Sequence, residues 1–367
     1  MTIKSLVKKL SLPFYLTKRI GFSKKKYWAI RAGGIVLAFL AAGIVCTCLK
    51  PGSFGEFYVQ MFMGCFDPTD ITIFVDLLVR FSILLLISVI LIPPFKMRFW
   101  NIGAEGQILV GGLVAGGIAK FAPASLPNIV VLLICLAGAM LASTIWSLIP
   151  TIFKAFFNTN ETLFTLMMNY IASTLSLMMI YIWVPTGSQN FGALTHGIFP
   201  TILGNPGTLA VAFTAVIFAG MYLYITKGKH GYEVTVLGES VDTARYIGIN
   251  VKKVTIRTMA TSGALFGVVG FFIVCAVNQS FSATIVGGQG FTGVLIAWLG
   301  HFNPLEVALF AFLSSVMTQG TSRVHMPSSA QFSAICTGVF FFIIIACEFF
   351  SSYKISWRHN EKKEASV

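Results

Sequence analysis

Polar side chains that could bind or gate a solute occur at two places in an otherwise apolar sequence. The first is "RFWNIGAEGQILVGG", residues 98–112, which carries Asn101, Glu105 and Gln107 among glycines. An amide both donates and accepts hydrogen bonds, and a carboxylate accepts them. We expect Asn101 to cap a helix that begins at residue 102, and Glu105 to be stabilised in the first turn of that helix. The three side chains then form either a structural elbow or part of an inner gate.

The second place is residues 161–184, where Glu161, Thr165, Asn169 and Ser173 recur every four residues. This spacing puts the four side chains on one face of a helix. Polar side chains in a membrane helix face the bundle interior or a water-filled cavity. The face therefore lines a substrate path or makes hydrogen bonds between helices. Asn169 is the candidate for substrate contact, because an amide can pair with hydroxyl groups or with the edge of a base.

Enzymatic chemistry has no support in the sequence. The five histidines lie on different segments, and the chain has no H-E-x-x-H, no G-x-S-x-G and no G-x-x-x-x-G-K-[ST] motif. The seven cysteines form no C-x-x-C pair and lie mostly in apolar stretches, which predicts packing rather than metal binding. We expect no catalytic residue, no metal site and no cofactor on this chain.

The elements that must position the polar residues are membrane helices. Of the 367 residues, 56% are hydrophobic and only 11% are charged, and the mean hydropathy is +0.82. Ten stretches approach the roughly 20 apolar residues that a membrane span needs. They are residues 29–49, 71–92, 102–119, 128–149, 161–184, 207–226, 258–277, 290–300, 305–319 and 330–350. We predict an all-α, polytopic membrane protein of about ten transmembrane helices, or nine if the short eighth stretch does not cross.

The positions of the basic residues predict the orientation of this bundle. With the N-terminus inside, the cytoplasmic segments hold 22 of the 26 Lys and Arg residues, as cytoplasmic loops do. We therefore expect both termini in the cytoplasm. The formal net charge of +13 then reflects orientation. Nucleic-acid binding is not expected, because the basic residues are spread over several loops and do not gather with aromatic residues on one domain.

Three parts follow along the chain. Residues 1–28 form a basic cytoplasmic segment, which serves as a topology signal or as an interfacial amphipathic helix. Residues 29–351 form the transmembrane domain, and residues 352–367 a charged cytoplasmic tail. Within the second span, Asp76 and Arg80 are four residues apart. We expect them to neutralise each other, as buried charges in a membrane do, with an ion relay as the alternative.

The longest cytoplasmic loop, residues 227–257, exceeds a simple turn between neighbouring helices. It predicts a short helix over residues 239–247, with Glu239 and Asp242 near its N-terminus and Gly248 ending it. Ala244 and Gly248 would present a notch of small residues, with Tyr246 close by. Such a surface helix could dock into a cleft on a cytoplasmic partner; a solvated loop with an incidental helix is the alternative.

Four motifs carry a resemblance to a known family. They are "NIGAEGQ" at residues 101–107, "NETLFTLMMNYIA" at 160–172, "ARYIGINVKKV" at 244–254 and "GGQGFTGVLIAWLG" at 287–300. In this order and spacing, the chain resembles the permease subunits of bacterial ABC importers for nucleosides and simple sugars. These belong to the wider ribose and branched-chain amino-acid permease class, and they work with a lipoprotein receptor of the basic-membrane-protein type.

The resemblance implies a permease domain in the bacterial cytoplasmic membrane, in a dimer with an identical or related permease. Separate ATPase subunits would bind and hydrolyse ATP, so the chain itself is not an enzyme, and an extracytoplasmic lipoprotein would deliver the substrate. Residues 239–250 would be the coupling helix. Relatives have a pair of small residues before the tyrosine, whereas this chain has Ala244 and Arg245, and Arg245 would affect which ATPase is accepted.

The substrate that the resemblance implies is a nucleoside, chiefly a purine nucleoside. A simple sugar or a flavin-like nutrient is the alternative within the same class. Outside that class, an ion-coupled secondary transporter would also be a polytopic bundle, but it would need more ionisable residues in its spans and no docking helix.

Two glycine-rich segments indicate internal symmetry. "NIGAEGQILVGGLVAGG" opens the third span from the inside, and "VGGQGFTGVLIAWLG" opens the eighth from the outside. Five spans separate them, which is the relation that an inverted repeat of five plus five helices would require.

Overall fold

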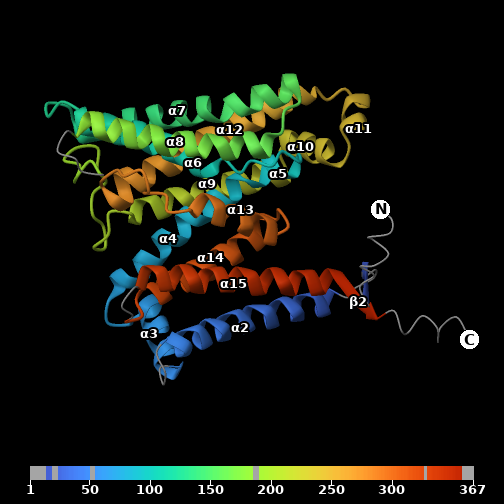
Figure 1. The fold of residues 1–367 in the computed structure, drawn as a ribbon. Helices are drawn as coiled ribbons and strands as arrows, with labels where there is room; N and C mark the ends of the chain where they lie inside the picture. Colours follow the sequence, from blue (N-terminus) through green and yellow to red (C-terminus); the bar gives the residue numbers. More distant parts are fainter. Residues whose placement is uncertain (1–13, 19–23, 50–53, 185–189, 326–328, 358–367) are drawn as a thin grey trace, which may run out of the picture. The chain divides into compact units, whose positions relative to one another are not determined.

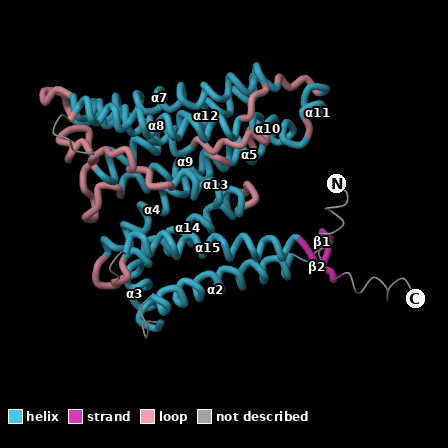
Figure 2. Tube along the Cα trace, in the orientation of Figure 1, coloured by secondary structure: helices cyan, strands magenta, loops and turns pink. Residues whose placement is uncertain are grey.

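The computed structural model describes residues 14–18, 24–49, 54–184, 190–325 and 329–357. The chain falls into two compact units, residues 1–61 with 320–367 and residues 62–319. Helices make up nearly all of the secondary structure, apart from one short ribbon of two strands (Figures 1 and 2). The expected all-α architecture is therefore confirmed. The alternative of an interfacial helix at the N-terminus falls largely on residues outside the described ones.

The unit that contains both termini is built on a pair of long helices. α2 (Lys24–Leu49) packs along α15 (Ser329–Ser352), and β1 (Phe14–Lys18) pairs antiparallel with β2 (Tyr353–Trp357). Between the two helices, Arg31 Nε lies 3.0 Å from Glu348 Oε2, and both side chains are buried. The hydroxyl of Tyr27 donates to Glu348 Oε1 at 3.2 Å. The buried charges thus satisfy each other, as a low-dielectric environment requires.

The larger unit holds the segments that carry the polar motifs. Its helices are α4 (Ile71–Ile90), α5 (Ile92–Lys96), α6 (Ala104–Phe121), α7 (Asn128–Phe157), α8 (Glu161–Trp183), α9 (Thr208–Thr226), α10 (Lys229–Glu239), α11 (Val241–Tyr246), α12 (Val251–Phe271), the π-helical continuation η1 (Phe272–Asn278), α13 (Gln289–Leu299) and most of α14 (Pro304–Ser322). Each of the ten expected stretches contains a helix of one unit or the other.

The number of complete crossings is smaller than the number of helices. Within the described residues, seven helices are long and apolar enough to cross a membrane. α13 has 11 residues and spans about 16 Å, roughly half of the hydrocarbon thickness. α3 (Phe54–Phe66) was not among the expected spans, and with 13 residues it is also too short to cross. The chain is a multi-pass membrane protein whose apolar stretches include short helices.

The centre of the larger unit is formed by α6, α7 and α12, which run side by side in Figure 1. Glycines bring their backbones together. A Cβ on Gly267 of α12 would meet the backbone carbonyl of Ala139 in α7, and one on Gly270 would meet that of Ile108 in α6. Small residues at such positions permit close approach, which is how helices associate in lipid. The three helices therefore form a tightly packed core.

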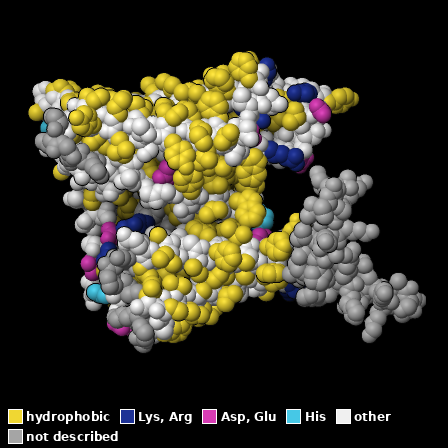
Figure 3. All heavy atoms as spheres, viewed as in Figure 1, with side chains coloured by type: hydrophobic (Ala, Val, Ile, Leu, Met, Phe, Trp, Pro, Cys, Tyr) yellow, Lys and Arg dark blue, Asp and Glu magenta, His cyan; other side chains and the backbone are white. Residues whose placement is uncertain are grey.

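The surface of the protein has the two faces of a membrane protein. Large apolar side chains are exposed along α7 and α8, for example Leu141 and Tyr181, and Figure 3 shows hydrophobic side chains covering this side. Lys, Arg, Asp and Glu side chains gather instead over α10 and α11. The exposed apolar side chains match a lipid environment, because a soluble protein would not leave so much contiguous apolar surface uncovered.

Candidate functional site

The "NIGAEGQ" segment forms a joint between α6 and α8. Asn169 of α8 donates its Nδ2 to the carbonyl of Ile102 at 2.9 Å, and its Oδ1 accepts from the backbone N–H of Gly106 at 2.9 Å. One turn away, the backbone N–H of Ile102 donates to Thr165 Oγ1 at 3.2 Å. Side chains of α8 therefore satisfy backbone groups at the beginning of α6, which would otherwise be orphaned.

Asn101 and Gln107 stabilise the same joint from within the segment. The side-chain amides pair with each other at 3.3 and 3.4 Å, and both residues are buried. Asn101 Oδ1 also accepts from the backbone N–H of Gly103 at 3.0 Å. The expected position of the cap was wrong: Gly103 is the N-cap of α6 and the helix begins at residue 104. Asn101 lies two residues earlier because the chain makes a tight turn there.

Glu105 lies in the first turn of α6, as expected, but its carboxylate reaches another helix. Oε1 accepts from the N–H of Gly288 at 2.8 Å and Oε2 from that of Gly290 at 2.7 Å. Gly288 is the N-cap of α13 and Gly290 lies in its first turn. The carboxylate thus caps the N-terminus of α13, and it brings together the two glycine-rich segments that the symmetry argument paired. A gating role for Asn101, Glu105 and Gln107 stays a prediction.

The polar face of α8 is engaged with its neighbours along most of its length. Glu161 forms an ion pair with Lys154 at the end of α7, at 2.9 Å. Thr165 and Asn169 contact α6 as described, and Ser173 is half-buried. These contacts are the hydrogen bonds between helices that were one of the two interpretations of the pattern. Whether the same face also lines a substrate path stays a prediction.

Asp76 and Arg80 in α4 do not pair with each other, contrary to expectation. Asp76 Oδ1 instead accepts from Asn205 Nδ2 at 2.5 Å, and no ion pair joins the two residues in the described part of the chain. Both line a cavity of about 420 Å³ together with Asn205, Asn278 and Gln289. Both residues therefore contribute to the wall of one polar cavity.

The long loop of residues 227–257 contains two short helices, where one was expected. α10 ends at Glu239, and Ser240 is the N-cap of α11, its hydroxyl accepting from the N–H of Thr243 at 3.2 Å. The expected helix over residues 239–247 was therefore placed too early, because Glu239 closes the preceding helix. Gly248 does follow α11, with φ of +86°, a conformation that glycine adopts without strain.

α11 presents large side chains rather than a notch. Tyr246 is 92% exposed, and Val241 and Ile247 are also exposed. Ala244 is completely buried against the bundle, so the predicted notch of small residues does not exist on the surface. Arg245 lies 3.5 Å from Asp242, and both are exposed. The exposed side of α11 therefore carries both apolar and charged side chains. Its other side packs against the larger unit through the buried Ala244.

α10, which precedes α11, packs against the end of α5 at one very close contact. A Cβ on Gly238 would meet the backbone carbonyl of Lys96, so the two backbones touch at this position. A groove of about 810 Å³ beside the contact is lined by Arg98, Lys154, Arg245, Lys252 and Glu239 among others. The groove carries more basic than acidic side chains. It would attract an acidic partner surface.

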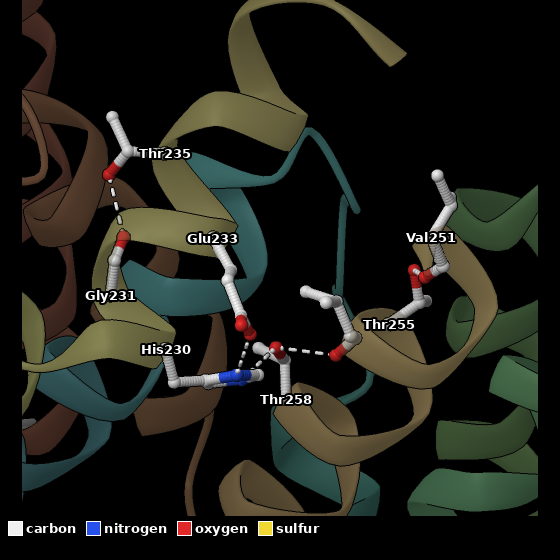
Figure 4. Close-up of polar contacts among 8 residues, drawn as sticks. His230, Gly231, Glu233, Thr235, Val251, Thr255 and Thr258 are labelled. Atoms are coloured by element: carbon white, nitrogen blue, oxygen red, sulfur yellow. Dashed lines mark hydrogen bonds and ion pairs between the residues drawn. The ribbon is translucent and has the colours of Figure 1, made fainter. Parts of the chain in front are cut away.

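A buried histidine holds α10 against α12, as Figure 4 shows. His230 Nδ1 lies 3.2 Å from Glu233 Oε2, and Nε2 lies 2.9 Å from Thr258 Oγ1. Burial, the largest cause, lowers the pKa of His230; the hydrogen bond with Glu233 raises it, and the charge of Arg257 lowers it further. The lowered pKa favours the neutral imidazole in the folded state.

Sequence reasoning missed three features of these sites. His230 and Gly238 lie in what was expected to be an irregular loop, and Gln289 sits inside the "GGQG" motif without having been singled out. A signal existed for Gln289, because polar residues within membrane segments usually face the bundle interior or a water-filled cavity. For Gly238 only the three-dimensional contact with residue 96 reveals the constraint.

Comparison with known proteins also indicates a membrane transport protein. A family model described as "Branched-chain amino acid transport system / permease component" matches residues 73–346. The glucose ABC transporter permease protein TsgB13 of Haloferax volcanii is 27% identical over an alignment of 341 positions, which covers 87% of this chain and 88% of that protein. The guanosine ABC transporter permease protein NupP of Bacillus subtilis is 26% identical, covering 87% of this chain and 92% of the relative.

A third relative is shorter in its match. The nucleoside ABC transporter permease protein NupB of Lactococcus lactis is 30% identical over 61% of this chain and 65% of its own length. All three relatives are transport subunits by name, and the family match runs from α4 into α15. The chain therefore belongs to the family of permease components of the branched-chain amino acid transport system type.

Proposed function

We propose that this chain is the membrane-spanning permease of an ABC importer and forms the translocation path for nucleosides. The observation that carries the proposal is α11, a short exposed helix with Tyr246 at its tip that is fixed to the bundle through Ala244 and Gly238. A secondary transporter has no need of such a helix. Two of the relatives named above are nucleoside or guanosine permeases, which supports a nucleoside as substrate. The glucose permease among them favours a sugar as the second candidate.

The proposed complex contains further subunits. Two ATPase subunits dock on α11 and bind and hydrolyse ATP, so that this chain carries no cofactor of its own. A second permease, identical or related, completes the path, and an extracytoplasmic lipoprotein delivers the substrate. The basic side chains Arg98, Lys154 and Lys252 along the groove beside α11 support docking of an acidic surface there.

The proposed topology places about ten helices in the cytoplasmic membrane of a bacterial cell, of which α13 does not cross completely, with both termini inside. The charge distribution supports it, and a helix occurs at each expected stretch. Fusing green fluorescent protein to the C-terminus tests the orientation, because the reporter fluoresces only in the cytoplasm. A dark but stably inserted fusion would reverse the orientation, and with it the assignment of α11 to the cytoplasm.

The test of the function is ATP-driven uptake by cells that express the chain with its native partners. Radiolabelled guanosine and glucose are compared, and the tagged permease is purified gently to identify ATPase subunits that accompany it. Tyr246→Ala should reduce both co-purification of the ATPase and uptake. Tyr181→Ala, which removes another exposed tyrosine, from α8, serves as the matched control. Uptake that continues without an ATPase, driven by an ion gradient, would contradict the proposal.

A further inference from the structure

A polar cavity in the larger unit has the properties of a solute-binding site. It measures about 420 Å³ and lies among α4, the loop before α9, the end of η1 and the start of α13. This volume falls within the usual range for small-molecule pockets. Its polar lining consists of Asp76, Arg80, Asn205, Asn278 and Gln289, and isoleucine and valine side chains make up the rest.

Two of the polar residues form a fixed frame. Asn205 Oδ1 accepts from the backbone N–H of Gly207 at 2.6 Å, which orients the amide. Its Nδ2 donates to Asp76 Oδ1 at 2.5 Å. The carboxylate of Asp76 is therefore held in one orientation at the wall of the cavity by a side chain from a distant segment.

The other three polar side chains have unused hydrogen-bonding capacity. Arg80, Asn278 and Gln289 come from α4, η1 and α13, and none of these side chains has a hydrogen bond or ion pair with the residues that the structure describes. Arg80 and Asn278 are exposed, and Gln289 is half-buried. An ionised residue in a membrane segment normally has a partner or faces water. Donors and acceptors from three elements thus converge on one space, ready for a solute.

The lining also defines the chemistry of that solute. Arg80 and Asp76 place one formal charge of each sign on the wall, beside three side-chain amides, and this lining suits an uncharged molecule with several donors and acceptors. A guanidinium donates readily to a carbonyl oxygen of a base. Amide and carboxylate groups bind hydroxyl groups. Building on the function proposed above, we propose that this cavity is the station at which the permease holds a nucleoside. Arg80 donates to the base carbonyl, while Asn278 and Gln289 bind the sugar hydroxyls.

Glu105 acts on this site as a positioning residue. Its carboxylate holds the N–H groups of Gly288 and Gly290, the two neighbours of Gln289 in the chain. This fixes the backbone from which the Gln289 side chain enters the cavity. The joint between α6 and α8 fixes Glu105 in turn, so the cavity wall is connected to the centre of the bundle.

The experiment compares uptake of inosine with uptake of purine riboside, which has the same sugar and ring but no carbonyl on the base. Cells expressing the full chain with its native partners take up either labelled nucleoside in the presence of ATP. Arg80→Ala should lower inosine uptake about ten-fold or more, the effect of losing a charge-assisted hydrogen bond. Purine riboside uptake should change about two-fold at most. Gln289→Ala should raise KM for both nucleosides.

Three comparisons make the result decisive. Thr284→Ala changes an exposed residue of the same loop that does not line the cavity, and it should leave both rates unchanged. Arg80→Lys keeps the charge but loses the planar fork; it controls for insertion, and it should also favour purine riboside. Membrane abundance and co-purification of the ATPase are measured for every variant.

Equal loss of both nucleosides, or no loss, in an abundant and assembled Arg80→Ala protein would overturn the proposal. The proposed function is tested separately, by the uptake that the unmodified protein shows. If that protein takes up glucose but neither nucleoside, nucleoside transport itself is wrong.

Discussion

The carboxylate of Glu105, at the start of α6, accepts a hydrogen bond of 2.7 Å from the backbone N–H of Gly290, at the start of α13. The two N-termini are in direct contact, since a Cβ on Gly290 would meet the backbone nitrogen of Glu105. A helix N-terminus carries a partial positive charge. Two of them at this distance would repel each other, and the carboxylate between them offsets the repulsion for both helices.

Glu105→Gln should therefore destabilise the folded protein by about 2 kcal/mol, because a neutral amide can replace at most one of two charge-assisted hydrogen bonds. The measurement is thermal unfolding in detergent. Glu239→Gln, a matched change at an exposed residue, should leave the midpoint nearly unchanged. An unaltered midpoint for Glu105→Gln would show that the contact contributes no net stability.

Gly238→Ala should disturb the contact between α10 and α5, because the new methyl group would collide with the carbonyl of Lys96. Overpacking of this kind costs about 1–3 kcal/mol, and here it also displaces α11. We expect ATP-driven uptake to fall more than membrane abundance. In α9, Gly220→Ala adds the same group where no atom lies within 4 Å, and normal uptake is expected. Normal uptake by both variants would contradict a role for this contact in coupling.

Asn169→Leu separates the two interpretations of the polar face of α8. The change leaves the carbonyl of Ile102 and the N–H of Gly106 without their partner, at about 1–3 kcal/mol for each buried group. As a joint, Asn169 should affect thermal stability and abundance. As a substrate contact, it should instead raise KM in a protein of normal stability. Ser173→Ala, on the same face, should be nearly neutral for stability.

Acidification should weaken the attachment of α10 through His230. Since burial lowers its pKa in the folded protein, the unfolded chain binds the proton more readily below the ordinary value of about 6.5. Stability is therefore fully present above that pH and is lost as the pH falls toward the lowered pKa. The midpoint of thermal unfolding, followed from about pH 7.5 to 5.5, should fall less in His230→Gln than in the unmodified protein. His196→Gln should keep the original slope.

Hydropathy and charge were sufficient to predict the helical elements, since each expected apolar stretch contains a helix. The sequence did not predict α3 or the division of residues 227–257 into α10 and α11. α3 is apolar, but its 13 residues are too few to be recognised as a span. The division into α10 and α11 depends on a local polar contact, the cap of Ser240 on Thr243, which a hydropathy pattern does not record. The boundary at Val251 was also missed, because α12 extends seven residues beyond its apolar part, capped by Asn250.

The sequence predicted which residues form the candidate sites, but not which residues they contact. Spacing placed Asp76 and Arg80 on one face of a helix and so suggested a pair. Asn205, about 130 residues away in the chain, competes for the same carboxylate, and no local pattern reveals it. The sequence likewise placed Glu105 correctly in the first turn of α6. It did not reveal that the Glu105 carboxylate accepts hydrogen bonds from the N-terminus of α13. Side chains that join distant segments are determined by the packing of the bundle.

The glycine contacts of α12 have a mechanical consequence. Because Gly267 and Gly270 bring its backbone against α7 and α6, relative sliding of these three helices would force backbone atoms into one another. These three helices should therefore move as one rigid body. Any rearrangement within the larger unit is left to helices outside these glycine contacts, such as α4, which lines the cavity with Arg80 and is followed by two prolines in α5.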